Sequence, residues 1–182
     1  MSIQALMNIR RLKVLDLTAN SIVQLPSDMS KFAALEEINL TDNNLGHKSK
    51  DTGCTSLLRT LGQMPRLKRL NLSRNKIVRL ASDLFKGNTD FLELQEIDVS
   101  FNWLDDERNL WFLSQTRGVN LVIITGNPFA SRSGKNGAQN DYEVLENELA
   151  KNLSAVVIND VGLVDENGFY LKRKAGQQRP ML

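Results

Sequence analysis

The residues that could support covalent catalysis are few and are not arranged for it. His47 is the only histidine and Cys54 is the only cysteine in the chain. A nucleophile activated by a histidine base needs the pair within hydrogen-bonding distance, with the base oriented by a third group. Nothing in the pattern around these two residues supplies that orientation. We therefore interpret His47 as a solvated loop residue and predict no catalytic residue and no enzyme activity.

A second stretch imitates a phosphate-binding loop, because an apolar segment is followed by Gly134-Lys135 and a predicted helix. A phosphate loop needs two glycines that bracket four residues, followed by Lys and then Ser or Thr. Counted back from Lys135, the first glycine position holds Phe129, and Asn136 replaces the hydroxyl residue. We interpret the stretch as a loop of the fold and predict no cofactor.

Three consecutive acidic residues, Asp105, Asp106 and Glu107, are the candidate for metal chemistry. A hard cation such as Ca²⁺ takes about 6–8 oxygen ligands, and no fourth oxygen ligand lies nearby in the sequence. Acidic side chains in a first helical turn cap free amides and complement the helix dipole. Because the apolar run 110–113 follows, we interpret the acids as the start of a helix and predict no metal site.

A repeated pattern of apolar residues predicts the strands and turns on which the surface residues lie. Residues 67–77 have apolar side chains at the first, fourth, sixth and eleventh positions and Asn at the ninth. The same frame begins at Leu12, Leu35 and Leu94, and in a looser form at Val119. Alternate side chains of a strand point to opposite faces, so the fourth and sixth positions should be buried and the third, fifth and seventh should face solvent. The Asn should turn the chain by bonding nearby backbone groups.

This frame resembles the leucine-rich repeat family. The resemblance implies an α/β leucine-rich repeat solenoid, a curved right-handed superhelix with a parallel sheet on the concave face and helices and turns on the convex face. The predicted strands lie near 14–17, 37–40, 69–72, 96–99, 121–124 and 155–158. The side chains predicted to be buried are those of Leu15, Leu17, Ile38, Leu40, Leu70, Leu72, Ile97, Val99, Val122 and Ile124.

The five repeats define a domain over residues 1–160, followed by an extended basic arm over 161–182. Asn140 and Glu143 form a capping box at the start of a late helix. Residues 126–160 resemble the C-terminal cap of intracellular leucine-rich proteins of the phosphatase-1 regulatory, dynein light chain and spliceosomal A-prime types. The loop before the late helix is longer here than in that pattern.

The N-terminal end of the predicted sheet is an open question. Ile3, Leu6 and Ile9 have helical spacing, so we interpret them as the outer arc of an incomplete repeat. The strand near 14–17 would then be an exposed sheet edge. Three explanations remain open, namely that the first residues fold over this edge, that a partner covers it, or that the sequence is truncated.

Composition limits the broad class of the protein. With 182 residues, 41% of them apolar, the chain can form one domain with a sizeable core. It has no apolar run long enough to span a bilayer and no signal-peptide pattern, so we expect no membrane contact. A single cysteine cannot form an internal disulfide. We expect an intracellular, cytoplasmic protein, with the cytoskeleton or cilium as narrower locations and the nucleus as the alternative.

The solvent-facing positions of the predicted sheet carry mostly polar side chains. They include the four carboxylates of Asp16, Glu37, Glu96 and Asp98, against a single arginine, Arg69. Such a surface repels a phosphate backbone. We therefore expect a protein partner and no nucleic acid on this face.

Apolar residues interrupt that polar surface near the last two repeats. Leu121 and Ile123 occupy solvent-facing positions, and Phe101 and Trp103 flank the asparagine of the adjacent repeat. Exposed apolar area of this kind marks a contact surface, and Trp is enriched among binding hot spots. The alternative is that the loop 130–139 or the arm folds back and covers these residues.

The positive charge is concentrated in the arm. Lys172, Arg173, Lys174 and Arg179 follow Tyr170 with no acidic residue among them, and their removal changes the net charge from +2 to −2 because each carries one positive charge. The residues predicted to bind a partner are Asp16, Glu37, Asn39, Arg69, Asn71, Arg74, Glu96, Asp98, Phe101, Trp103, Leu121, Ile123, Lys172, Arg173 and Lys174.

The resemblance implies a protein-binding adaptor or a structural subunit of a larger intracellular assembly, including axonemal and other cytoskeletal ones. The partner proteins would belong to a multi-subunit complex and would bind the concave face, the arm and the N-terminal end. The alternative is a ribonucleoprotein subunit of the splicing type, with a protein partner and marginal RNA contact.

Overall fold

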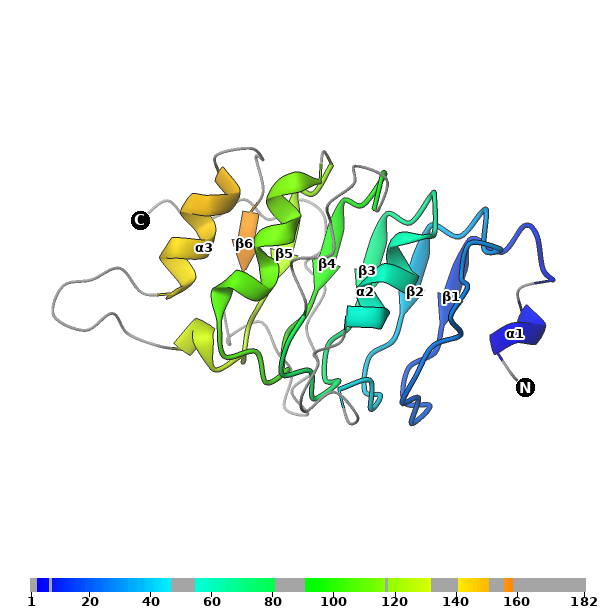
Figure 1. The fold of residues 1–182 in the computed structure, drawn as a ribbon, viewed down its shortest axis with the longest axis horizontal. Helices are drawn as coiled ribbons and strands as arrows, with labels where there is room; N and C mark the ends of the chain where they lie inside the picture. Colours follow the sequence, from blue (N-terminus) through cyan, green and yellow to red (C-terminus); the bar gives the residue numbers. More distant parts are fainter. Residues whose placement is uncertain are drawn as a thin grey trace, which may run out of the picture.

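Six short strands form one parallel sheet in the computed structural model. The structure describes residues 3–6, 8–46, 55–80, 91–116, 118–131, 141–150 and 156–158. The strands are β1 Val14–Asp16, β2 Glu37–Asn39, β3 Arg69–Asn71, β4 Glu96–Asp98, β5 Leu121–Ile123 and β6 Val156–Ile158. Their order in the sheet is their order in the chain, and every neighbouring pair is parallel (Figure 1). All six predicted strands are confirmed.

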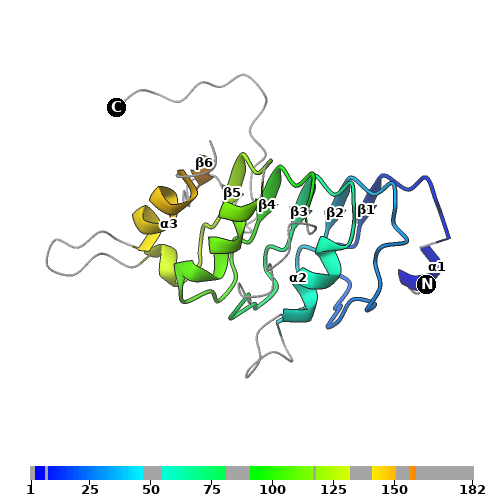
Figure 2. The same cartoon turned by 45° about the horizontal axis from the view of Figure 1, so that its top comes forward.

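Short helices precede or connect the strands. They are α1 Ile3–Leu6, α2 Thr55–Gly62, the 3₁₀ helices η1 Glu107–Gln115 and η2 Phe129–Ser131, and α3 Asp141–Ala150. Figures 1 and 2 show α2 and α3 on the same side of the sheet, and α3 packs against η1 and η2. Asp106 caps η1, because its carboxylate accepts a hydrogen bond from the Arg108 backbone N–H at 2.9 Å. The acidic run therefore starts a helix, as predicted.

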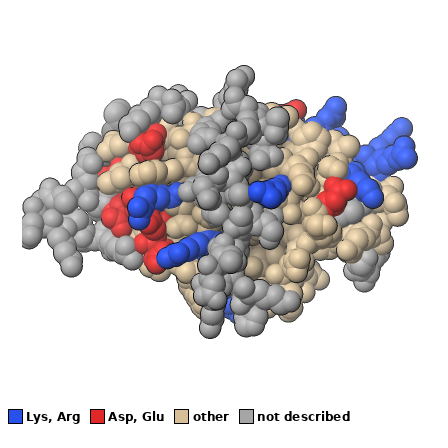
Figure 3. Space-filling view, in the orientation of Figure 1, with Lys and Arg blue, Asp and Glu red and all other residues tan. Residues whose placement is uncertain are grey.

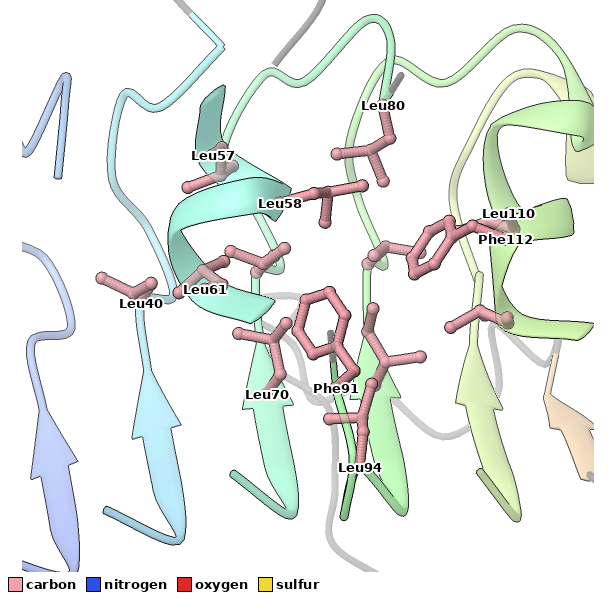
Figure 4. Packing of buried hydrophobic residues seen from close by; sticks show 14 of the residues in the cluster. Leu40, Leu57, Leu58, Leu61, Leu70, Leu80, Phe91, Leu94, Leu110 and Phe112 are labelled. Carbon is pink, nitrogen blue, oxygen red and sulfur yellow. The ribbon is translucent and has the colours of Figure 1, made fainter. Parts of the chain in front are cut away.

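The register of the sheet brings identical frame positions together. Leu15, Ile38, Leu70, Ile97 and Val122 pair in succession across the strands, so the fourth position of the frame forms a continuous apolar row. These side chains face the helices. Leu58 and Leu61 of α2 reach the same layer as Leu40, Leu70 and Phe91 (Figure 4). The core thus lies between the sheet and the outer elements.

The burial prediction is confirmed for nine of its ten side chains and is wrong for Leu17, which is only half-buried. The sixth-position residues Leu40 and Leu72 are fully buried because each lies between two neighbouring repeats. Leu17 has a described repeat on one side only, while α1 contributes partly buried Ile3 and Leu6 to the core. The end of the core at β1 is therefore incompletely covered.

A residue with left-handed backbone geometry follows each of the first five strands. It occupies the eighth frame position, and its φ lies between 52° and 73°. The residues are Ala19, Asp42, Arg74, Phe101 and Gly126. At Gly126, a Cβ atom would lie 2.6 Å from the ring of Phe101, so only glycine fits. The five turns therefore share a left-handed φ at this position. The Phe101 ring lies against Gly126 of the following repeat.

Candidate partner-binding surface

Buried asparagines hold the ends of the strands in place. Asn75 Nδ2 donates to the carbonyl oxygens of Leu72 and Ser73 in its own repeat, at 3.0 and 2.9 Å, and to Leu40 O of the preceding repeat, at 2.8 Å. Its Oδ1 accepts from Leu45 N–H at 3.3 Å. Asn43, Asn102 and Asn127 likewise donate to a carbonyl of the preceding repeat.

These bonds join the repeats to one another. The sequence pattern predicts the turning role of the asparagine, but it gives no sign of the bonds to the preceding repeat, because those depend on how the repeats stack.

The side of the sheet opposite the helices, which carries the third, fifth and seventh frame positions, is called the strand face below. The asparagines make the strand face a rigid array.

The fifth frame position has a structural role that sequence reasoning missed. In four of the five repeats its side-chain oxygen accepts a hydrogen bond from the backbone N–H two residues later, whereas the fifth repeat has Ile123 at this position. The pairs are Asp16 with Thr18 at 2.9 Å, Asn39 with Thr41 at 3.1 Å, Asn71 with Ser73 at 2.9 Å and Asp98 with Ser100 at 2.8 Å. The signal was present as the recurring triplet Asp/Asn, apolar, Ser/Thr, which is the sequence of a side-chain-capped turn.

Exposure along the strand face is uneven. Asp16 is exposed and Asn39 and Asn71 are half-buried, but Asp98 and Ile123 are each only 8% exposed. The expectation that these two side chains face solvent is wrong. Asp98 turns its carboxylate onto the Ser100 amide.

The seventh-position side chains of Thr41, Ser73, Ser100 and Thr125 are also buried rather than exposed. Thr41 and Ser73 show the reason. Their hydroxyl groups donate to Asn39 and Asn71 at 2.7 Å and lie 3.1 Å from each other. This row is part of the turn structure, so it is not available to a partner.

Burial raises the pKa of Asp98 above the ordinary value of 3.8, and the hydrogen bond that its carboxylate accepts from the Ser100 backbone N–H acts in the opposite direction. An acid whose pKa is raised in the folded state contributes stability below its unfolded pKa, and this contribution is lost as the pH rises through the folded pKa. The charged form of Asp98 is therefore unfavourable in the folded state, and its cost to stability grows as the pH rises above the ordinary pKa of an aspartate.

We expect Asp98→Asn to raise the melting temperature at pH 7, because Asn39 and Asn71 show that an amide oxygen accepts the same bond. The gain should shrink as the pH falls toward the ordinary pKa of an aspartate. Thermal melting followed by circular dichroism between pH 3 and pH 7 measures it, with Asp16→Asn at the exposed equivalent position as the control. An unchanged or lower melting temperature at pH 7 would contradict this assignment.

Ion pairs neutralise part of the acidic surface predicted from the sequence. Arg69 pairs with Glu37 on the neighbouring strand. At the second frame position, Lys13 and Lys68 contact Glu36 at 2.9 and 3.0 Å. The hydrogen bonds from Lys13 and then Lys68 lower the pKa of Glu36 to about 2. The surface therefore presents charges of both signs rather than a wall of carboxylates.

The predicted apolar strip is present in part. Trp103 is 56% exposed, and Phe101 and Leu121 are half-buried. The Arg74 guanidinium lies 4.5 Å from the centre of the Phe101 ring, a cation–π arrangement that joins two adjacent repeats. Ile123 belongs to the buried part of the sheet, so Trp103 is the most exposed member of the strip.

Several residues considered in the sequence lie outside the described residues. They include His47, Cys54, Lys135 and the arm residues Lys172, Arg173 and Lys174. Within the described part of the chain, no group of three or more His, Cys, Asp or Glu residues could hold a metal ion. None of the helices described is long and apolar enough to cross a membrane.

Comparisons with known proteins agree with this architecture. The model of the Leucine Rich Repeat family matches residues 66–88, which include β3 and its turn. A solved structure of a leucine-rich repeat protein from Leptospira interrogans is similar, with a TM-score of 0.50 and 19% identity over 69% of this chain. The match covers 29% of the Leptospira protein, and at this identity it shows the fold alone.

The parallel sheet, the stacked asparagine turns and the outer helices define a leucine-rich repeat solenoid. The chain has the fold of leucine-rich repeat proteins, and its residues 66–88 match the model of the Leucine Rich Repeat family.

Proposed function

We propose that this protein binds another protein through the accessible part of its strand face together with Trp103. This surface, called the partner surface below, consists of Asp16, Glu37, Asn39, Arg69, Asn71, Arg74, Glu96, Phe101, Trp103 and Leu121. The observation that carries the proposal is a 56% exposed tryptophan at the edge of a rigid polar array. Tryptophan is enriched among the residues that dominate binding energy.

The array is suited to binding because it is already ordered. Four fifth-position side chains, those of Asp16, Asn39, Asn71 and Asp98, are fixed by a bond to the following turn. The four buried asparagines fix the ends of β2 to β5. Docking therefore costs little conformational entropy in the protein itself. Arg69 pairs with Glu37 and lies beside Glu96 on the next strand. A partner protein would therefore meet positive and negative charges at defined positions.

The narrower role we propose is that of an adaptor or structural subunit in a multi-subunit cytoplasmic assembly, with the cytoskeleton or cilium as its setting. The resemblance of residues 126–160 to caps of the dynein light chain type supports this setting. A second contact is proposed at the β1 end, where core residues are incompletely covered. The proposed partners are proteins, with no role for nucleic acid, a cofactor or a membrane.

Crosslinking mass spectrometry on captured complexes tests which surface is used. Lys13 and Lys68 adjoin the strand face, and Lys76 follows the β3 turn, whereas Lys31 lies in the outer arc between β1 and β2. We expect partner crosslinks from Lys13, Lys68 and Lys76. Crosslinks confined to Lys31 and other outer-arc residues would contradict the proposed surface.

The arm supplies a separate prediction. We propose that Lys172, Arg173, Lys174 and Arg179 contact an acidic region of the partner. Deleting residues 172–182 should then weaken binding and flatten its dependence on salt, because exposed charge pairs are screened within about 10 Å at 0.1 M salt. Titrations at low and high salt, with and without the arm, measure this. Equal affinities in all four conditions would show that the arm makes no contact.

A further inference from the structure

Three observations show that the β1 end lacks a neighbour among the described residues. β1 pairs only with β2. Leu12, Leu17 and Ile22 are half-buried, whereas their counterparts in the second repeat are at most 6% exposed. The Asn20 side chain is exposed and donates to Thr18 O of its own repeat, at 2.9 Å, while the side chains of the later asparagines reach a preceding repeat.

The same end presents exposed apolar side chains and a backbone edge that pairs with no other described strand. Val14 is 56% and Ile9 is 49% exposed. The bonds Glu37 N–H to Lys13 O and Leu17 N–H to Asn39 O show which residues of this strand face β2. The backbone groups of Val14 therefore point away from β2, toward the open edge. An edge of this kind is a template for pairing with another strand.

The charges beside β1 differ between its two ends. Arg10 and Arg11 are both exposed and precede the strand, next to Lys13. Figure 3 shows Lys and Arg side chains gathered at this end of the molecule. At the carboxyl end of β1, Ala19 N–H donates to Thr41 O at 2.9 Å, and the exposed Asp42 follows. Cations therefore stand at the amino end and a carboxylate at the carboxyl end.

We propose that the occupant of this edge is a second copy of the same chain, with the two β1 strands pairing antiparallel about a two-fold axis. In that arrangement the amino end of each β1 faces the carboxyl end of the other, so Arg10 and Arg11 of one copy lie near Asp42 of its partner. The surface is self-complementary in charge, as a two-fold interface requires. The pairing also covers Val14 and the half-buried leucines. This inference rests on the proposed contact at the β1 end, and it is independent of the partner surface.

Sedimentation velocity on the purified full chain, over a range of concentrations and at low and high salt, tests the proposal. We expect a reversible dimer that weakens as salt is added. Arg10→Glu with Arg11→Glu should raise the dissociation constant about tenfold or more, because each favourable charge pair becomes repulsive on both sides of the two-fold axis. Asp42→Lys alone should also weaken the dimer.

The deciding variant combines all three substitutions. Arg10→Glu, Arg11→Glu and Asp42→Lys together restore opposite charges across the antiparallel pair, so dimerisation should return toward the wild-type value. Lys31→Glu, a charge reversal in the outer arc, is the control and should leave it unchanged. Melting temperatures measured on each variant establish that it is folded.

A monomer at every concentration, or a dimer that ignores the charge reversals, would overturn the proposal. So would a combined variant that remains as weak as the Arg10→Glu, Arg11→Glu protein. None of these results depends on a second protein, so they are distinguishable from failure of the partner surface.

Discussion

Asn75→Ala is expected to destabilise the fold by about 2–5 kcal/mol. The substitution removes three hydrogen bonds from Nδ2 and one to Oδ1, all in a fully buried setting. Each buried bond contributes about 0.5–1.5 kcal/mol net, and an unsatisfied amide adds its own penalty. The loss acts on two repeats at once, because Leu40 O and Leu45 N–H belong to the repeat before Asn75.

Urea denaturation measures the free energy of unfolding, with the slope checked for constancy between variants. Asn20→Ala is the matched control, since Asn20 occupies the same frame position but is exposed and bonds a single carbonyl. It should cost less than about 1 kcal/mol. Equal costs at the two positions would mean that the asparagines do not join the repeats.

Leu70→Ala is the second large effect, with an expected loss of about 2–5 kcal/mol. Leu70 is 2% exposed at the centre of β3, between Ile38 and Ile97 in the apolar row. Truncation removes its contacts with the layer that contains Leu61 and Phe91 (Figure 4). The cost includes the cavity left behind, because rigid strands on both sides limit collapse.

Leu17→Ala removes the same atoms from a half-buried site and should cost clearly less. Both variants are measured by the same denaturation series, so the comparison cancels differences in method. A Leu70→Ala variant as stable as wild type would be incompatible with the sheet register described here.

The part of this fold that could be predicted from the sequence is the part that repeats. An eleven-residue frame that recurs five times gives the strand positions, their parallel order and the buried fourth position, because each unit must bury its apolar face on the next. The prediction of burial fails for Leu17 because burial at the sixth position depends on neighbours on both sides. That is a property of the stack rather than of the repeat.

The exposure of the surface residues was harder to predict, because it also depends on how the repeats stack. Alternation along a strand correctly places Asp16 and Glu37 on the strand face, but it cannot show that Asp98 and Ile123 are covered. It also cannot separate the capping role of Asn39 from a binding role. The triplet of Asp/Asn, apolar and Ser/Thr residues holds that information, although only the observed bonds reveal its meaning.

We propose that Trp103 and the strand face form a docking site and are not merely a part of the core. The most direct test measures binding of the captured partner and the melting temperature on the same preparations of Trp103→Ala and Trp111→Ala. Trp111 is the matched control because it is 37% exposed but lies on η1, among the outer elements. We expect Trp103→Ala to weaken binding about 30-fold, as hot-spot losses near 2 kcal/mol imply, with an unchanged melting temperature. Retained binding with a lowered melting temperature, or an equal loss for Trp111→Ala, would contradict the account.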